Sequence, residues 1–220
     1  MTEAELRAAI VAACRAMNAT GLNQGLAGNI SVRHGETMLI TPTSTPYDQM
    51  RPEDIAVVPL AGAAKDSASP RRPSSEWRFH RDLLLARKDI GAVVHAHAPY
   101  CTALSIARRG IPPCHYMVAT FGGDDVRCAR YETFGTAALS DAVRDAMLDR
   151  FACLMANHGM LTAGSDLAQA MWRATELEAL ARQYQLALAA GGVVLLSPAD
   201  IDSARDMFKS YRRASNPLCS

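Results

Sequence analysis

The order of hydrophobic and polar positions divides the chain into amphipathic helices and short apolar strands. Near the N-terminus, apolar residues recur at helical intervals of three or four positions: Leu6, Ile10, Cys14 and Met17. Thr2 and Glu5 precede this stripe with the spacing of a capping box, and Gly21 follows it as a stop signal. The pattern predicts a first amphipathic helix.

A glycine-rich stretch then leads into two β-type runs, ISVR and TMLIT, separated by His34, Gly35 and Glu36. This arrangement predicts a β-hairpin. A third run, IAVVPL, predicts another strand, and the polar, proline-rich KDSASPRRP that follows predicts an exposed loop.

The rest of the chain alternates between helical and strand patterns. We expect the following elements in chain order: a helix over 76–88 capped by Ser74 or Ser75, a buried strand over 91–98, a helix over 99–110, short strands and turns over 111–135, a helix over 136–150, a strand over 151–159, a long helix over 167–190 and a last helix over 198–213. Together these elements predict one α/β domain over residues 1–220. Its central sheet would be mixed or mainly antiparallel and flanked by helices.

Composition narrows the choice of function. The 220 residues are 49% hydrophobic, enough for a full core, and the net charge is only +1 with scattered arginine doublets, so no nucleic-acid surface is expected. No export signal and no membrane-length apolar run is visible, which favours the cytoplasm. The cysteines form no CxxC pair and are expected to be reduced thiols: Cys14, Cys101, Cys114, Cys128, Cys153 and Cys219.

The candidate chemistry lies in two short motifs, HAHA and ANHG. Residues two apart on a strand project to one face, so His95 and His97 can converge on one ion. His158 stands at the end of another expected strand, where Gly159 would permit a sharp turn, and Glu76 opens a helix. Three imidazoles and a carboxylate suit zinc, although a histidine near a core strand can also be a hydrogen-bonded structural residue.

Seven motifs occur in the order typical of one known family: GLNQGLAGNISVR, MLITPT, PSSEWRFH, AVVHAHA, HYM, TFGT and NHG. The chain resembles the class II aldolase/adducin family over nearly its whole length, and within that family it most resembles the enzymes that cleave L-fuculose 1-phosphate. The resemblance implies the class II aldolase fold. It also implies one zinc ion per subunit, or another divalent ion such as Mn²⁺ or Co²⁺, held by Glu76, His95, His97 and His158.

The same resemblance implies a phosphate-binding set: Asn29, Thr43, Ser44, Ser74 and Ser75. Hydroxyl and amide donors at the start of a helix are suited to a phosphate dianion, because the helix dipole adds a favourable potential. Ser74 and Ser75 could instead only cap the helix. The family commonly has glycine where this chain has Ser44, so a left-handed backbone at that position would be strained.

The resemblance assigns proton transfer to two residues. Glu76 would act as the base on the enediol side of the substrate, and Tyr116, from a neighbouring subunit of a homotetramer, as the proton donor at the aldehyde oxygen. The active sites would then lie at subunit interfaces. Phe134 and Tyr211 align with positions near the aldehyde end of the substrate.

The implied reaction is reversible cleavage of a small phosphorylated sugar, a ketose 1-phosphate of the fuculose, 5-deoxyribulose or 5-methylthioribulose type, into dihydroxyacetone phosphate and an aldehyde. Two enzymatic alternatives belong to the same superfamily, a sugar-phosphate 4-epimerase and a sugar-acid phosphate decarboxylase. The epimerase branch carries aspartate at the position of Glu76. A non-catalytic, adducin-like interaction module is a third alternative, and it is disfavoured because all four candidate ligands are present.

Overall fold

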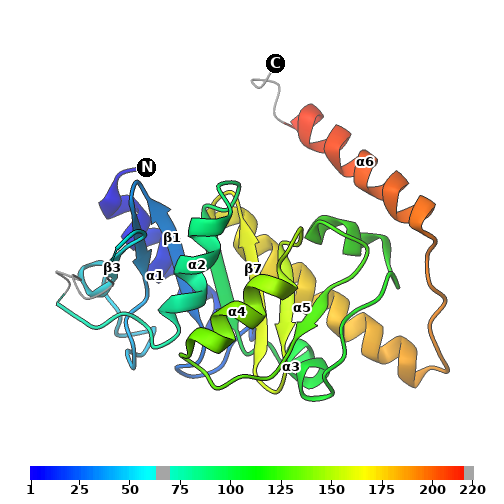
Figure 1. The fold of residues 1–220 in the computed structure, drawn as a ribbon, viewed down its shortest axis with the longest axis horizontal. Coiled ribbons are helices and arrows are strands. Elements are labelled where there is room, and N and C mark those ends of the chain that lie inside the picture. The colour runs from blue at the N-terminus through cyan, green and yellow to red at the C-terminus, as the bar shows by residue number, and fades with distance from the viewer. Residues whose placement is uncertain (63–69, 216–220) are drawn as a thin grey trace.

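The computed structural model describes residues 1–62 and 70–215. Its centre is a seven-stranded sheet in the order β3-β2-β1-β4-β7-β6-β5 (Figure 1). The strands are β1 (Asn29–His34), β2 (Thr37–Ile40), β3 (Ala56–Pro59), β4 (Ala92–Ala96), β5 (Arg127–Ala129), β6 (Ala152–Met155) and β7 (Gly159–Gly164). Neighbouring strands are antiparallel except for β5 and β6, which are parallel. The prediction of a single α/β domain with a mixed, mainly antiparallel sheet is confirmed.

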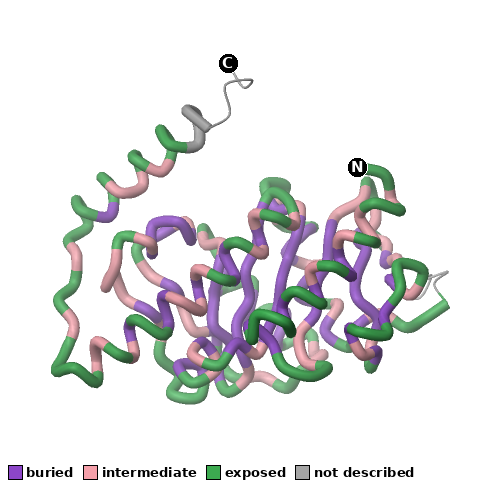
Figure 2. Tube along the Cα trace, turned by 180° about the vertical axis from the view of Figure 1, so that it is seen from behind, coloured by how far each residue is buried: buried purple, intermediate pink, exposed green. Residues whose placement is uncertain are grey.

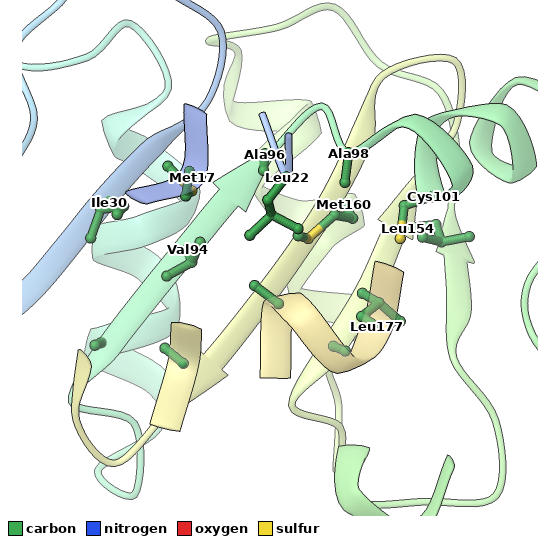
Figure 3. Close-up of a cluster of buried hydrophobic side chains, with 14 of the residues drawn as sticks. Met17, Leu22, Ile30, Val94, Ala96, Ala98, Cys101, Leu154, Met160 and Leu177 are labelled. Atoms are coloured by element: carbon green, nitrogen blue, oxygen red, sulfur yellow. The ribbon is translucent and has the colours of Figure 1, made fainter. Parts of the chain in front are cut away.

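Helices cover both faces of the sheet. They are α1 (Glu3–Ala19), α2 (Trp77–Ala86), α3 (Pro99–Ile106), α4 (Ala137–Ala146), α5 (Leu167–Ala189) and α6 (Pro198–Ser215), with 3₁₀ turns η1 (Pro52–Asp54) and η3 (Tyr116–Phe121). One apolar cluster joins α1, α3 and α5 to the sheet, and a second joins α2 and α4 to the opposite face. Figure 3 shows the first cluster, where Met17 and Leu177 approach the central strands.

The last helix stands apart from these layers. In Figure 1, α6 projects away from the sheet, and its described contacts are chiefly with η3. Figure 2 shows buried positions concentrated along the sheet, whereas α6 is largely exposed. Among the described α-helices, α6 therefore has the smallest share in the domain's core, with Ile201 as its buried residue.

Local signals account for most of the element boundaries. The capping box of α1 is formed, since Glu5 N donates to Thr2 Oγ1 at 3.3 Å and Thr2 N donates to Glu5 Oε2 at 2.7 Å. The first hairpin turns at Gly35, whose φ of 57° is in the left-handed region that glycine enters without strain. The predicted first helix and hairpin are confirmed.

One local prediction was wrong, and one strand was missed. The N-cap of α2 is Glu76, without a side-chain capping bond, so neither Ser74 nor Ser75 caps the helix. The missed strand is β7, the segment from Gly159 to Gly164, because GMLTAG shows no alternation of apolar and polar residues. The expectation of short strands and turns over 111–135 is confirmed, since this stretch contains the 3₁₀ turn η3 and the short strand β5.

The remaining expectations concern the loop 65–73, the cysteines and membrane-spanning helices. The predicted loop 65–73 lies partly outside the described residues, and the described Arg71 and Arg72 are exposed. Five cysteines within the described range are free thiols, as expected, and Cys219 lies outside that range. Among the described residues, no helix is long and apolar enough to cross a membrane.

Candidate metal centre

Three histidines meet where the two central strands β4 and β7 begin or end. The rings of His95 and His97 have centroids 5.0 Å apart, and the ring of His158 lies 4.8 Å from His95 and 5.1 Å from His97. One nitrogen from each ring lies within 4.8 Å of the others. The structure therefore brings together the three histidines proposed from the sequence, in a cluster that can hold a metal ion.

Backbone geometry explains why the rings converge. His95 lies on β4, which pairs with β7, and His158 lies in the turn between β6 and β7. We expected Gly159 to permit this turn, but the residue with a left-handed backbone is Asn157, with φ 54°. Gly159 is needed for close approach instead, because a Cβ there would lie 2.7 Å from the carbonyl oxygen of Ala96.

Glu76 reaches the cluster from the start of α2. Its Oε2 lies 3.3 Å from Nε2 of His95, and its Oε1 lies 3.1 Å from Nε2 of His158. The side chain is 9% exposed, and Asn29 Nδ2 donates to Oε2 at 2.9 Å. The fourth residue proposed from the sequence therefore contacts two of the three histidines.

The contacts between Glu76 and the histidines lower the pKa of Glu76 and raise the pKa of His95. Burial by itself would raise the pKa of Glu76, but the positive charges and hydrogen bonds of His95 and His158 outweigh it and lower that pKa. Burial would lower the pKa of His95, but Glu76 outweighs it and the pKa is raised. Glu76 is therefore a carboxylate at neutral pH. The pKa of His97 is lowered to about 4, first by burial and then by the charges of His95 and His158.

The donor set fits a divalent cation. Nδ1 of His95 faces the carbonyl oxygen of Met160 at 2.8 Å, and since that oxygen only accepts, Nε2 is left free to coordinate. His95 Nε2 and Glu76 Oε1 are buried and, in the described part of the chain, have no polar partner beyond the contacts between Glu76 and the histidines given above. Buried ligand atoms whose partners are other members of the same histidine–carboxylate cluster are the expected signature of a metal site.

A pocket of about 390 Å³ opens above the cluster. Its lining includes every residue of the proposed phosphate set: Asn29, Thr43, Ser44, Ser74 and Ser75. Glu76, His97 and His158 line it as well. Lysine and arginine are absent from the described lining, so an anion here would be bound by neutral donors, by the positive end of α2 and by any cation that the histidines hold.

Ser44 lies in the left-handed region, with φ 53°. The backbone strain expected from serine at this position is therefore present, at a cost of roughly 1–2 kcal/mol relative to glycine. Its hydroxyl lies 3.5 Å from the hydroxyl of Thr43 at the mouth of the pocket.

The residues proposed for the aldehyde side are divided between two places. Phe134 lines the pocket, whereas Tyr116 and Tyr211 do not. Tyr116 is 52% exposed on η3 and stacks on Phe208 of α6 with ring centroids 6.1 Å apart, and Tyr211 is exposed on α6. One chain by itself does not bring either tyrosine to the histidines.

Sequence reasoning missed the residues that support the glycine-rich loop before Asn29. Tyr47 Oη donates to the carbonyl oxygens of Ala27 and Gly28 at 3.1 and 2.8 Å. Asn23 accepts from the backbone N–H of His97 at 3.1 Å while its amide nitrogen donates to Ala27. Both residues are buried. The position of Asn23 inside the glycine-rich motif is a signal that could have marked it, whereas Tyr47 lies 19 positions from Gly28 and has no such signal.

The mixed sheet carries a histidine cluster that can hold a metal, at the base of a pocket whose described lining has no lysine or arginine, which is the arrangement of an enzyme site. The chain belongs to the class II aldolase and adducin family, because the model described as Class II Aldolase and Adducin N-terminal domain matches residues 8–185. This confirms the family proposed from the motifs.

Individual relatives agree with the family assignment. The chain is 45% identical to the 5-methylthioribulose-1-phosphate/5-deoxyribulose-1-phosphate aldolase of Rhodospirillum rubrum, over 94% of this chain and 92% of that protein. It is 42% identical to the L-fuculose phosphate aldolase of Escherichia coli K12, over 96% of this chain and 97% of that protein. A solved structure of L-fuculose 1-phosphate aldolase superposes with a TM-score of 0.89 at 34% identity, covering 93% of this chain and 96% of its own.

Proposed function

We propose that this protein is a zinc-dependent class II aldolase that reversibly cleaves a ketose 1-phosphate into dihydroxyacetone phosphate and an aldehyde. The supporting observation is the juxtaposition of a carboxylate, Glu76, with three histidines at the base of a pocket lined by neutral phosphate donors. The reaction class agrees with the names of the relatives, which are aldolases and therefore carbon–carbon lyases.

His95, His97 and His158 are the residues that would hold the cation, with Glu76 as a fourth ligand in the resting site. We propose zinc because three imidazoles favour it over harder cations. When bound, the cation supplies Lewis-acid stabilisation of negative charge on the substrate oxygens.

Glu76 is suited to accept the proton that must leave during cleavage or condensation. Its carboxylate is ionised, and Asn29 holds one of its oxygens at 2.9 Å. A substrate whose oxygens occupy the space beside the histidines would displace Glu76 from its contacts with His95 and His158. The freed carboxylate would then lie beside the reacting carbon. The lysines within the described range, Lys88 and Lys209, are exposed and do not line the pocket, so no Schiff base is invoked.

The phosphate would bind to the hydroxyls of Thr43, Ser44, Ser74 and Ser75 and to the amide of Asn29, all of which line the pocket. Ser75 is exposed and free of any capping role, so its hydroxyl is available to a ligand. The aldehyde part of the substrate would then lie toward Phe134, which is 66% exposed at the same pocket.

We further propose that the enzyme is a cytoplasmic homotetramer, built from one domain over residues 1–220, with its active sites at subunit interfaces. Tyr116 and Tyr211 lie outside the pocket of their own chain, on η3 and the projecting helix α6. A neighbouring subunit could place its Tyr116 over the pocket, where a phenol can donate a proton to the aldehyde oxygen.

The most informative experiment uses the synthetic direction. Zinc-loaded protein is incubated with dihydroxyacetone phosphate and one aldehyde at a time. The aldehydes are acetaldehyde, (methylthio)acetaldehyde and lactaldehyde, which correspond by carbon count to deoxyribulose, methylthioribulose and fuculose phosphates, respectively. We expect a new ketose 1-phosphate with at least one aldehyde, and none without zinc. Absence of carbon–carbon bond formation with all three would refute the proposal, and recovery of a stereoisomer from a pentulose phosphate would favour the epimerase.

A further inference from the structure

Four buried polar side chains face one another between β1 and α2. Asn29 and Ser31 lie two apart on the strand and project to one face, while Glu76 and His80 lie four apart at the start of the helix. Two strand residues span about 6.8 Å, and four helix residues span about 6 Å, so the two pairs can match like rungs. All four residues are buried, with at most 7% of each residue's surface exposed.

A continuous chain of contacts joins these four residues. Ser31 Oγ lies 2.8 Å from Nδ1 of His80, and Nε2 of His80 lies 2.5 Å from Oδ1 of Asn29. Nδ2 of Asn29 lies 2.9 Å from Oε2 of Glu76. The chain therefore ends on the carboxylate beside the histidine cluster.

The direction of each hydrogen bond follows from the carboxylate. An ionised Glu76 only accepts, so the group of Asn29 that faces it is the NH₂, and the amide oxygen must face His80. That oxygen also only accepts, so Nε2 of His80 carries the ring hydrogen. Nδ1 is then the acceptor for the hydroxyl of Ser31. Every donor in the chain points toward Glu76.

The imidazole of His80 is neutral in this setting. Burial, and then the positive charge of His95, lowers the pKa of His80 to about 3. The ring also stacks on Phe79, with centroids 4.7 Å apart, so its plane is fixed by packing as well as by hydrogen bonds.

We infer that His80 is a positioning residue that fixes the orientation of the Asn29 amide, so that this amide donates both to Glu76 and to the occupant of the pocket. The amide nitrogen carries two hydrogens, one of which is directed to Glu76, and Asn29 lines the pocket. A rotated amide would turn its oxygen toward the carboxylate and toward any phosphate. The N–H of His80 prevents this, because it cannot donate to an NH₂ group. The turnover test of this inference rests on the proposed function.

Two substitutions of His80 separate its hydrogen bonds from its volume. Glutamine carries an amide N–H near the position of Nε2 and is the conservative variant, whereas leucine fills the space without polar groups. We expect His80→Leu to lower kcat/KM for a phosphorylated ketose by about 10- to 100-fold, because a misoriented Asn29 amide would lose its hydrogen bond to a charged group, and His80→Gln to recover most of the loss. If His80→Gln is no better than His80→Leu, the inference is wrong.

Leu83 provides a matched control on the same helix. It is 2% exposed and packs in the apolar cluster under α2, and its side chain has no polar atom that could join the hydrogen-bond chain. Leu83→Ala should lower the stability of α2 by opening a cavity but leave kcat/KM unchanged at temperatures where the protein is folded. An equal loss of turnover in Leu83→Ala would show that any loosening of α2 has the same effect, and would overturn the positioning role.

A measurement on the wild-type protein needs no substrate. Long-range ¹H–¹⁵N NMR distinguishes the two neutral tautomers of histidine, and the His80 signals are identified by their loss in His80→Gln. We expect hydrogen on Nε2 across neutral pH, in the metal-free and the zinc-loaded protein. Hydrogen on Nδ1 would reverse the whole chain and refute the inference, whether or not the protein proves to be an aldolase.

Discussion

Gly159 lies directly against the ring of His97, so that a Cβ on this glycine would be 3.0 Å from Cδ2 of that ring and 2.7 Å from the carbonyl oxygen of Ala96. The distance to the Ala96 oxygen is shorter than real Cβ contacts allow, the distance to the His97 ring is tighter than most of them, and backbone cannot yield as a flexible side chain can. Gly159→Ala should therefore displace the end of β4 from β7 where the histidines meet. We expect zinc affinity to fall together with stability, the latter by about 1–3 kcal/mol.

Gly164, at the other end of β7, is the matched control for this prediction. A Cβ there would lie 2.5 Å from the backbone nitrogen of Ala170 on α5, remote from the histidines. Gly164→Ala should cost stability by a similar amount while zinc affinity, measured by competition with a chelator, stays at the wild-type value. Equal zinc affinity in the two variants would mean that the approach of Gly159 to His97 does not shape the site.

Ser74 and Ser75 offer a separation of structural and binding roles. Ser75 is exposed at the pocket and does not cap α2, so Ser75→Ala should leave the melting temperature unchanged. It should weaken a phosphorylated substrate by about 10- to 100-fold, the effect of about 1.5–3 kcal/mol for a hydrogen bond to a charged group. Unphosphorylated analogues should be unaffected.

Ser74→Ala is the comparison. Its Oγ is buried and accepts the N–H of Glu76 at 3.3 Å, so this change should lower stability as well. If Ser75→Ala weakens phosphorylated and unphosphorylated compounds equally, the hydroxyl does not bind phosphate.

The shared active site predicts complementation between two defective variants. Glu76→Gln and Tyr116→Phe would each be inactive or nearly so, but in a ring that takes Glu76 from one subunit and Tyr116 from the next, mixed assemblies contain intact sites. Random mixing of equal amounts should restore about a quarter of the sites. Activity of a co-refolded mixture, compared with the sum of the separate variants, measures this. No gain in a mixture shown to contain both chains would place both residues in the same subunit's site.

Short-range patterns were sufficient to predict the helices and the histidine motif, because period and capping are local properties of the sequence. Thr2 and Glu5 form their box, and α5 begins at Leu167 as the spacing indicated. β7 could not be predicted in this way. Its small residues follow no period, and it becomes a strand because β4 and β6 flank it on both sides.

The same distinction holds for the site. His95 and His97 could be paired from their spacing, but the contact of Glu76 with His95 and His158 depends on how α2 packs on the sheet. The role of His80 could not be predicted from the sequence, because its partners Ser31 and Asn29 are distant in sequence and face it only in the folded chain. Long-range packing, not propensity, assembles that chain.

His80 also makes stability depend on pH. Its pKa in the folded protein is about 3, lowered from 6.5 first by burial and then by His95, so the unfolded chain binds one proton more between these values. Stability should therefore fall as pH falls through this window, by about 1.4 kcal/mol per pH unit from this group. His80→Gln should lose stability less steeply in urea titrations of metal-free protein. The charged groups that face His80, Glu76 and His95, are present in both proteins, and parallel pH profiles would mean that His80 is protonated when folded.

We propose that Glu76 acts both as a metal ligand and as the base, and the variant Glu76→Gln separates these two roles. Glutamine retains the size and one oxygen that can face the cation, and His95, His97 and His158 remain, so zinc content should persist. Turnover should fall by about 10²–10⁴, the usual effect of losing a general base.

The sharper assay is exchange of the C3 proton of dihydroxyacetone phosphate with deuterated water, followed by NMR, because this half-reaction needs zinc and the base but no aldehyde. Glu76→Gln should lose the exchange, whereas Tyr116→Phe, altered only at the aldehyde end, should retain much of it and lose cleavage. Exchange at the wild-type rate in zinc-loaded Glu76→Gln would leave Glu76 as a ligand alone, and the base would have to be sought among the other residues that line the pocket.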